Sequence, residues 1–198
     1  MNAPAAFLVA VAYLLGSVSF AVLLVRSATG KDIRTEGSGN AGATNVLRAH
    51  GKALGLAVAA LDVGKGAAAV ALVRLATADS RYSAAAGFAA VLGHVFPIFY
   101  GFRGGKGVAT AFGAFLVLAP LAALVCAGIF FAVVAATRYV SLASVVAMVA
   151  LPPVAGSLFH ARPPVVVAAA ATAILVVLKH RENLKRLARG TERKVGSK

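Results

Sequence analysis

Long apolar segments separated by short polar ones dominate this sequence of 198 residues. Hydrophobic residues make up 60% of the chain and charged residues 13%, whereas a soluble domain has about 45–50% and about 25%. This composition excludes both an ordinary soluble domain and a disordered chain. The sequence therefore predicts an all-α, polytopic membrane protein, since helices satisfy their own backbone hydrogen bonds in lipid.

Apolar segments long enough, or nearly long enough, to cross a bilayer recur along the chain. A spanning helix needs about 20 apolar residues. The segment 107–137 is too long for one span and short for two, and Pro120 near its middle favours a division, because proline disrupts a helix interior. The first segment lacks the basic flank of a signal peptide, so we expect no cleavage. The predicted spans are then seven: 4–25, 53–77, 83–100, 107–119, 121–137, 140–159 and 164–179.

The distribution of basic residues supports seven spans and gives them a direction. The net charge is +14, from 20 Lys and Arg and 6 Asp and Glu. With seven spans, sixteen of the basic residues fall on one side, mostly in the polar loops 26–52 and 101–106 and the basic tail 180–198. Positive loops are typical of the cytoplasmic side. We expect the N-terminus outside, the C-terminus in the cytoplasm, and a single domain over residues 1–198.

The first polar segment, 37–48, has the composition of an anion-binding loop. Glycines allow successive backbone N–H groups to face one concavity, and a nearby arginine adds a forked cation suited to phosphate. A flexible linker is the simpler interpretation, but a linker rarely needs so many donors beside an arginine. The candidate residues are Ser38, Gly39, Asn40, Gly42, Thr44, Asn45 and Arg48.

The second polar segment is a glycine-rich turn that opens directly into an apolar helix. Such a turn at a helix N-terminus is suited to an anion. It is not a P-loop, because that motif needs Ser or Thr after its lysine and this lysine is followed by glycine. A tight positive turn and a hydrogen-bonded histidine are the simpler interpretations. The candidates are His94, Gly104, Gly105, Lys106 and Gly107.

The third polar segment lies in the basic tail. On a helix, His180 and Asn183 share a face, and Arg186 lies one turn further along. That face offers a base and two donors. Taken alone, the segment favours a basic anchor on anionic lipid.

Two smaller features involve polar groups inside predicted spans or at their ends. A lone charge at mid-membrane costs about 2.5–3.5 kcal/mol, so Asp62 and Lys65, three positions apart, predict an ion pair that is either structural or functional. Ser141 and Ser144 lie at the start of a span, where they either cap the helix, the simpler interpretation, or contact a substrate.

The three polar segments offer two anion cradles, several cations and few carboxylates, all at one predicted membrane face. This pattern favours binding of more than one phosphate group together with a lipid, as in phospholipid synthesis or transfer. We expect no metal, no organic cofactor and no nucleic-acid partner. A small transporter would more often hold its polar groups near mid-membrane, and a membrane anchor recruiting a partner would leave the first two motifs unexplained.

The same motifs occur in one known family, in the same order and over nearly the whole chain. On segments 38–48, 93–110 and 180–192, the sequence resembles the bacterial acyl-phosphate:glycerol-3-phosphate acyltransferase family, PlsY. Smaller matches are 13–17, 62–66 and 138–144. The resemblance implies seven spans in the bacterial inner membrane and an active site facing the cytoplasm. It implies transfer of a fatty acyl group from acyl phosphate to the 1-hydroxyl of glycerol 3-phosphate, giving lysophosphatidic acid and phosphate.

The resemblance also assigns roles to residues. The implied catalytic residues are Ser38, Arg48, Lys106, His180 and Asn183. The implied substrate-binding residues are Gly39, Asn40, Gly42, Thr44, Asn45, His94, Gly104, Gly105, Gly107, Ser141 and Arg186. We expect the proton of the attacking hydroxyl to pass either to His180 or, as we favour, to the donor's own phosphate.

Three further comparisons concern the family pattern. Ala41 stands where the family has proline or a bulkier residue, and Ser19 where it often has proline; neither removes a donor or a charge. The His-x-x-x-x-Asp motif of other glycerolipid acyltransferases is absent, because none of the four histidines has aspartate five positions later.

Overall fold

Each long apolar segment of the chain folds as helix. The computed structural model describes residues 3–196, and this part of the chain contains helices and no strand. Two 3-10 helices, η1 (Ile33–Thr35) and η2 (Ile98–Tyr100), and one π-helix, η3 (Val154–Leu158), accompany the α-helices. The α-helices are α1 (Ala3–Gly16), α2 (Phe20–Thr29), α3 (Ala43–His50), α4 (Lys52–Ala76), α5 (Ser80–Val95), α6 (Val108–Leu118), α7 (Pro120–Thr137), α8 (Val140–Pro153), α9 (Pro163–Lys179) and α10 (Arg181–Ala188).

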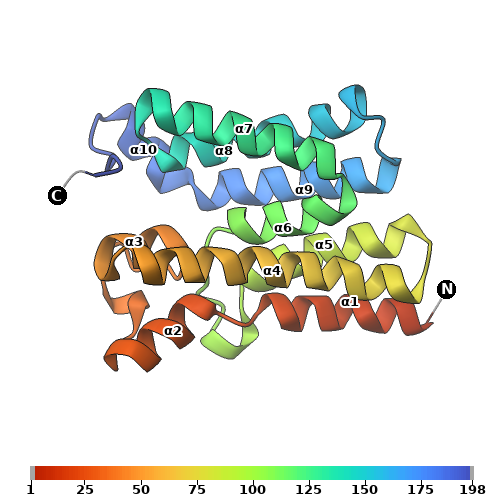
Figure 1. Ribbon diagram of the computed structural model, residues 1–198, viewed down its shortest axis with the longest axis horizontal. Helices are drawn as coiled ribbons and strands as arrows, with labels where there is room; N and C mark the ends of the chain where they lie inside the picture. Colours follow the sequence, from red (N-terminus) through yellow and green to blue (C-terminus); the bar gives the residue numbers. More distant parts are fainter. Residues whose placement is uncertain (1–2, 197–198) are drawn as a thin grey trace.

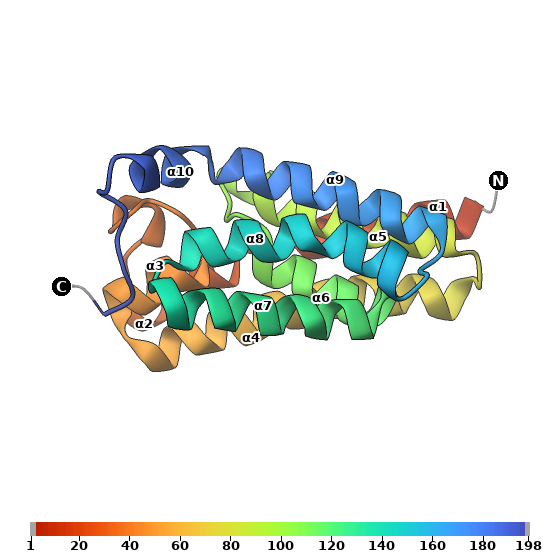
Figure 2. The same ribbon diagram turned by 90° about the horizontal axis from the view of Figure 1, so that it is seen from above.

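The long helices form one elongated bundle. Helices α1 and α4 to α9 run along its length, whereas α2, α3 and α10 gather at the end where the C-terminus lies (Figures 1 and 2). The N-terminus lies at the opposite end. Within residues 3–196, five helical stretches are long and apolar enough to cross a membrane, or six if α9 and α10, bent by 57°, count as one. The all-α, multi-pass membrane class is confirmed, and the number seven stays a prediction.

Two of the predicted spans can be compared directly with the helix ends: the division at Pro120 and the first span, 4–25. The division at Pro120 is confirmed, because α6 ends at Leu118 and proline occupies the first turn of α7, where its missing N–H is tolerated. The predicted span 4–25 corresponds to one apolar helical stretch long enough to cross a membrane, Ala3–Thr29. This stretch is interrupted, because α1 ends at Gly16 and Ser19 caps a separate α2 that continues to Thr29. With 11 residues, α6 is about 16 Å long, well short of the about 30 Å hydrocarbon core.

Small residues allow the helices of the bundle to approach closely. A Cβ added at Gly66 of α4 would overlap the carbonyl oxygen of Thr110, and one at Gly113 of α6 would overlap the carbonyl oxygen of Val63. The two glycines therefore bring the backbones of α4 and α6 together from both sides, as small residues do in membrane helix pairs.

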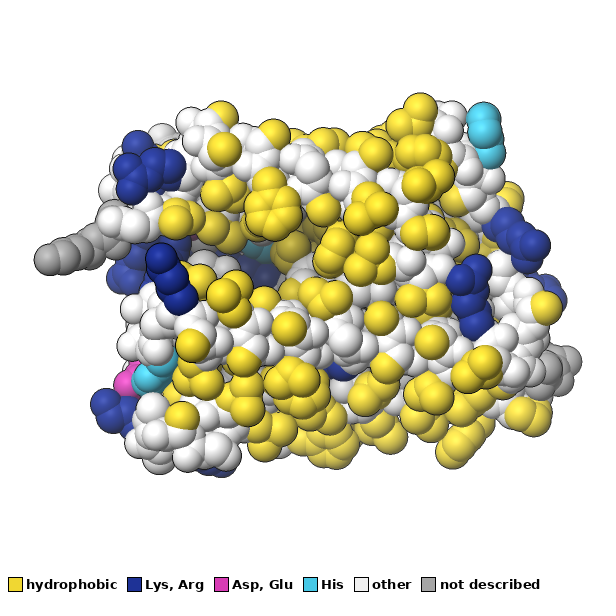
Figure 3. All heavy atoms as spheres, in the orientation of Figure 1, with side chains coloured by type: hydrophobic (Ala, Val, Ile, Leu, Met, Phe, Trp, Pro, Cys, Tyr) yellow, Lys and Arg dark blue, Asp and Glu magenta, His cyan; other side chains and the backbone are white. Residues whose placement is uncertain are grey.

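The surface of the bundle fits a lipid environment. Figure 3 shows hydrophobic side chains over the middle of one flank, with Lys and Arg side chains towards the two ends. On this flank the surface is hollowed between α7 and α4, near the end that carries the C-terminus.

Candidate active site

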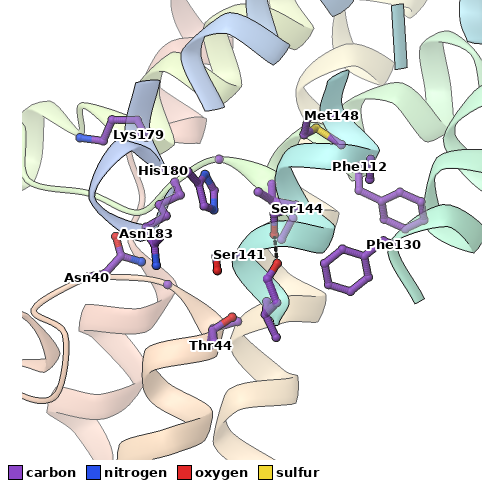
Figure 4. A pocket seen from close by; sticks show the side chains of 18 of the residues that line it. Asn40, Thr44, Phe112, Phe130, Ser141, Ser144, Met148, Lys179, His180 and Asn183 are labelled. Atoms are coloured by element: carbon purple, nitrogen blue, oxygen red, sulfur yellow. Dashed lines mark hydrogen bonds between the residues drawn. The ribbon is translucent and has the colours of Figure 1, made fainter. Parts of the chain in front are cut away.

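One large cavity, of about 800 Å³, lies at the α3 and α10 end of the bundle and extends between the long helices. One part of it is polar and one part apolar: Asn40, Thr44 and Asn183 lie towards the polar part, and Phe112 and Phe130 towards the apolar part (Figure 4). Most of the residues predicted from sequence line it: Ser38, Gly39, Asn40, Gly42, Thr44, Asn45, Arg48, His94, Lys106, Gly107, Ser141, His180, Asn183 and Arg186.

The N-terminal ends of four helices meet at the polar part of the cavity. Gly42 precedes α3, Gly107 precedes α6 and His180 precedes α10, while Ser141 lies in the first turn of α8; all four residues line the cavity. A helix N-terminus carries unpaired N–H groups and a partial positive charge. Their convergence makes this end of the cavity attractive to anions before any side-chain charge is counted.

The first polar segment is an ordered loop followed by a helix. Gly37 and Gly39 have positive φ, of 59° and 69°, which favours glycine. The amide of Asn45 organises the loop: its oxygen accepts from the N–H of Ser38 at 3.0 Å, and its nitrogen donates to the carbonyl oxygens of Ile33 and Glu36. The loop therefore presents Ser38 and its neighbours to the cavity in a fixed form, while Asn45 serves mainly to hold the loop.

Two glycines of the second segment do not line the cavity. The N–H of Gly105 donates to the carbonyl oxygen of His94 at 3.1 Å, and a Cβ at Gly104 or Gly105 would overlap His94. These glycines let the turn pack against the end of α5. The part of this predicted cradle that reaches the cavity is Lys106 and Gly107.

Glu192 connects the second and third segments with α8. One of its carboxylate oxygens accepts from the hydroxyl of Ser141 at 2.9 Å and from the amide nitrogen of Asn183 at 2.7 Å; the other accepts from Nε of Arg186 at 2.7 Å. The amide oxygen of Asn183 in turn accepts from Nζ of Lys106. Burial alone would raise the pKa of Glu192, but these hydrogen bonds hold it below its usual value.

Sequence reasoning did not assign Glu192 to the site, although it lies within the third motif. The available signal was a carboxylate in an otherwise strongly basic tail. The preference for helix capping by the serines of α8 is wrong: Tyr139 is the N-cap residue and makes no side-chain cap, Ser141 donates to Glu192, and Ser144 donates to the carbonyl oxygen of Val140.

The two titratable groups in the middle of the polar part have altered proton affinities. Burial lowers the pKa of Lys106 to about 8; Glu192 opposes this, while the nearby cations add to it. Burial also lowers the pKa of His180 to about 4, with Lys106 contributing. Because Nδ1 of His180 lies 2.8 Å from the carbonyl oxygen of Val176, which can only accept, Nδ1 carries the proton and Nε2 carries the lone pair.

The basic tail, from residue 180 onward, packs against the helices that form the cavity. Arg48 of α3 donates to the carbonyl oxygen of Arg193 at 3.1 Å, and Arg138 donates to the carbonyl oxygen of Val195 at 2.7 Å. The N–H of Val195 donates in return to the carbonyl oxygen of Arg138. The segment after α10 therefore connects both sides of the cavity, so residues 180–196 do more than anchor the chain on anionic lipid; residues 197–198 lie outside the described part.

The predicted ion pair inside the bundle is present. Nζ of Lys65 lies 2.7 Å from Oδ1 of Asp62, and both side chains are buried. Asp62 and His94 line the inner wall of the cavity. Among the described residues no group of three or more His, Cys, Asp and Glu side chains is arranged to hold a metal ion.

Comparison with known proteins identifies the family of this chain. Residues 6–190 match the family described as glycerol-3-phosphate acyltransferase. The chain belongs to the glycerol-3-phosphate acyltransferase family. It is 47% identical over 185 residues to the glycerol-3-phosphate acyltransferase of Geobacter sulfurreducens, covering 93% of this chain and 94% of that one. It is 46% identical over 202 residues to the Neisseria gonorrhoeae protein of the same name, covering 100% and 98%.

Solved structures of the family have the same fold. The crystal structure of PlsY, an integral membrane glycerol 3-phosphate acyltransferase, in its glycerol 3-phosphate form has a TM-score of 0.92 with this chain at 40% identity, covering 98% of this chain and 96% of that one. Its lysophosphatidic acid form has a TM-score of 0.89 at 38% identity, with the same coverage. The predicted PlsY resemblance is therefore confirmed at the level of family and fold.

Proposed function

We propose that this acyltransferase moves a fatty acyl group from acyl phosphate to the 1-hydroxyl of glycerol 3-phosphate, giving lysophosphatidic acid and phosphate. One observation carries the proposal: a single cavity joins a strongly anion-attracting end to an apolar part between membrane helices. Both reactants contain a phosphate group, and the donor also contains a long apolar chain. The PlsY crystal structures include a glycerol 3-phosphate form and a lysophosphatidic acid form, which correspond to the proposed acceptor and the proposed product.

The donor phosphate binds against the first loop in this proposal. Ser38, Gly39 and Asn40 face the cavity there, and the N-terminus of α3, including Thr44, follows at once. Backbone N–H groups and a helix N-terminus together suit a phosphate group without a nucleotide motif.

The acyl chain of the donor extends into the apolar part. The cavity-lining residues of α8 run from Ser141 through Ser144 and Ala147 to Leu151, so the wall changes from polar to apolar along one helix face. The distance from Ser141 to Leu151 along the axis is about 15 Å, at 1.5 Å per residue. The hollow between α7 and α4 in Figure 3 gives a route for the chain from the lipid side.

Glycerol 3-phosphate binds at the opposite side of the polar part. Arg48, Lys106, Asn183 and Arg186 supply cations and donors, and Ser141 lies beside them. Four other predicted residues line the cavity that both substrates share: Gly42, Asn45, His94 and Gly107. Gly104 and Gly105 act through packing. Holding two reactants together in this way can lower a barrier by about 7–11 kcal/mol.

The reaction is an attack of the 1-hydroxyl oxygen on the acyl carbonyl carbon. The new ester C–O bond forms, the C–O bond to phosphate breaks, and phosphate leaves with the bridging oxygen. Cations and backbone N–H groups stabilise the oxyanion and the leaving phosphate. With a pKa of about 4, His180 is neutral and weakly basic at neutral pH. The single proton of the attacking hydroxyl therefore passes to an oxygen of the donor's phosphate, while Nε2 of His180 accepts from the 2-hydroxyl of glycerol 3-phosphate and orients that substrate. The scheme uses no metal or cofactor.

The proposal includes a topology of seven passes with the N-terminus outside and the C-terminus in the cytoplasm of a bacterial inner membrane. An odd number of passes is supported by the opposite positions of the termini in the bundle. The cytoplasmic direction is supported by the sixteen basic residues that seven passes gather on one side. We treat residues 1–198 as one domain, because the cavity draws on helices from α3 to α10.

The donor is tested with purified protein in lipid bilayers and glycerol 3-phosphate. Palmitoyl phosphate and palmitoyl-CoA are supplied in parallel, and lysophosphatidic acid and free phosphate are measured. We expect product from palmitoyl phosphate alone, with one phosphate released per product. Product from palmitoyl-CoA alone would overturn the proposed donor.

A further inference from the structure

The buried lysine of α4 contacts three polar groups inside the bundle. Nζ of Lys65 lies 2.7 Å from Oδ1 of Asp62, 2.8 Å from the carbonyl oxygen of Val18 and 2.9 Å from Nδ1 of His94. Lys65 is only 3% exposed. An ammonium group has three N–H donors and no acceptor; two of them make hydrogen bonds, to Val18 and His94, while Asp62 is an ion-pair contact whose Oδ1 makes no hydrogen bond within the described residues.

The break between α1 and α2 supplies one of these partners. Val18 lies in the non-helical step between the two helices, and its carbonyl oxygen is directed to α4. A continuous helix would have engaged that oxygen in its own ladder. The break therefore frees a carbonyl oxygen that contacts the ammonium group in addition to His94.

The contact with Lys65 determines which nitrogen of His94 carries a proton. Nδ1 of His94 lies 2.9 Å from Nζ of Lys65, which as an ammonium group can only donate, and 3.5 Å from Oδ1 of Asp62, which can only accept. The shorter contact favours an accepting Nδ1, and the neutral ring then carries its proton on Nε2. His94 is 7% exposed and lines the cavity, and among the described residues no group makes a hydrogen bond to Nε2. Nε2 lies beside Gly105, close to the carbonyl of Ala41 in the first loop.

The charges in this group balance. A carboxylate alone at the inner wall would repel a phosphate group, and a buried ammonium alone would be strongly destabilising. As a contact pair, Asp62 and Lys65 give the wall little net charge. The inner wall of the cavity then offers the substrate the neutral Nε2–H group of His94, and no net charge.

We infer that Lys65 is a positioning residue that holds His94 as a neutral Nε2–H donor to a phosphoryl oxygen of the acyl phosphate, and that Asp62 holds Lys65. This inference rests on the proposed function, because it assigns the phosphate against the first loop to the donor. His94 contacts the substrate directly, whereas Lys65 and Asp62 act through it.

Histidine substitutions test the donor atom. His94→Gln can keep an N–H near the position of Nε2, whereas His94→Asn keeps polar atoms only near the position of Nδ1. We expect kcat/KM for palmitoyl phosphate to fall about ten- to a hundredfold in His94→Asn, the range for loss of a hydrogen bond to a charged group, and to fall much less in His94→Gln. We expect KM for glycerol 3-phosphate to change less than threefold. Equal loss in both variants would overturn the assigned donor atom.

Separate substitutions of two lysines of α4, one buried and one exposed, test the positioning role of Lys65. We expect Lys65→Met to raise KM for palmitoyl phosphate about tenfold, while Lys52→Met, at the exposed start of α4, leaves it unchanged. Equal KM values for the two variants would overturn the positioning role.

The wild-type protein allows a test that no folding failure can obscure. Nitrogen-15 spectra of histidine-labelled protein in bilayers report which ring nitrogen is protonated, and the His94 signals are assigned by their loss in His94→Gln. We expect a protonated Nε2 and an unprotonated Nδ1; a protonated Nδ1 would overturn the inference. The spectra do not depend on turnover, so this result is independent of the activity assay. Wild-type protein that makes no product would overturn the proposed function, whereas a protonated Nδ1 in active protein would overturn only the role of His94.

Discussion

Lys106 donates a hydrogen bond to the side-chain oxygen of Asn183, 77 positions later in the chain. The contact joins the turn before α6 to α10, and Glu192 continues it to α8. Three segments that are separate in sequence thereby become one wall of the cavity. The properties of this wall, and of the helices that support it, lead to the following predictions.

The lowered pKa of Lys106 predicts a pH dependence. Lys106 is protonated below its pKa of about 8 and loses its charge as the pH rises through that value. Because the charged form attracts phosphate, we expect kcat/KM for glycerol 3-phosphate to fall above about pH 8. Lys106→Arg stays charged throughout, so its profile should lack this decline even if its rate is lower. A wild-type profile that stays level to pH 10 would contradict the assigned role.

Glu192 is expected to stabilise the folded protein. In Glu192→Gln the hydrogen bonds with Arg186, Asn183 and Ser141 lose their charged acceptor, which should lower the free energy of unfolding by about 1.5–3 kcal/mol. Glu182→Gln is the matched control, because Glu182 is largely exposed and pairs with Lys185 on the surface. Thermal unfolding in detergent compares them; equal midpoints would contradict the prediction.

The close contact of α4 and α6 predicts opposite effects of two alanine substitutions. Gly113→Ala places a Cβ against the backbone of Val63 and should destabilise the protein by about 1–3 kcal/mol. Gly64→Ala, with no atom within 4 Å of the new Cβ, should be neutral or stabilising by up to about 1 kcal/mol. Thermal unfolding of both variants checks this, and an unchanged Gly113→Ala would argue against tight packing there.

The apolar part of the cavity predicts a dependence on acyl-chain length. Ala147 is buried and lines this part, so Ala147→Phe should shorten it. We expect the ratio of kcat/KM for palmitoyl phosphate to that for decanoyl phosphate to fall about tenfold, the effect of about 1.4 kcal/mol. Val149→Phe, at a half-exposed position of the same helix, serves as control. An unchanged ratio in Ala147→Phe would mean that the chain lies elsewhere.

The assignment of the proton to the donor's phosphate predicts a modest effect of replacing His180. Loss of a general base usually lowers kcat by about 10²–10⁴. If Nε2 of His180 only accepts a hydrogen bond from the 2-hydroxyl of glycerol 3-phosphate, His180→Gln should lower kcat by about tenfold or less, the scale of one hydrogen bond. Single-turnover rates with palmitoyl phosphate measure this. A loss of a thousandfold in folded protein would instead make His180 the proton acceptor.

Much of the architecture could be predicted from the sequence because membrane helices are long and uniformly apolar. The division at Pro120 followed from the known behaviour of proline, and α6 begins directly after the predicted glycine-rich turn. The break between α1 and α2 could not be predicted, because Ser17 and Ser19 interrupt an apolar segment too weakly to signal a helix end.

The site was predictable in its residue types and less so in its contacts. Glycine-rich turns beside basic residues indicate anion binding, and most of these residues line one cavity. The contacts of Glu192 depend on how the segment after α10 folds back over α8, which no local pattern encodes. The packing role of Gly105 depends likewise on where α5 ends.

The most direct test of the account compares Lys106→Ala with Lys52→Ala and wild type in bilayers. Each protein receives palmitoyl phosphate and glycerol 3-phosphate, and its folding is checked by thermal unfolding. We predict that wild type and Lys52→Ala form lysophosphatidic acid and phosphate one to one, and that Lys106→Ala loses at least a hundredfold in kcat/KM, about 2.7 kcal/mol. Folded Lys106→Ala that matches wild type would contradict the claim that this cavity performs the transfer.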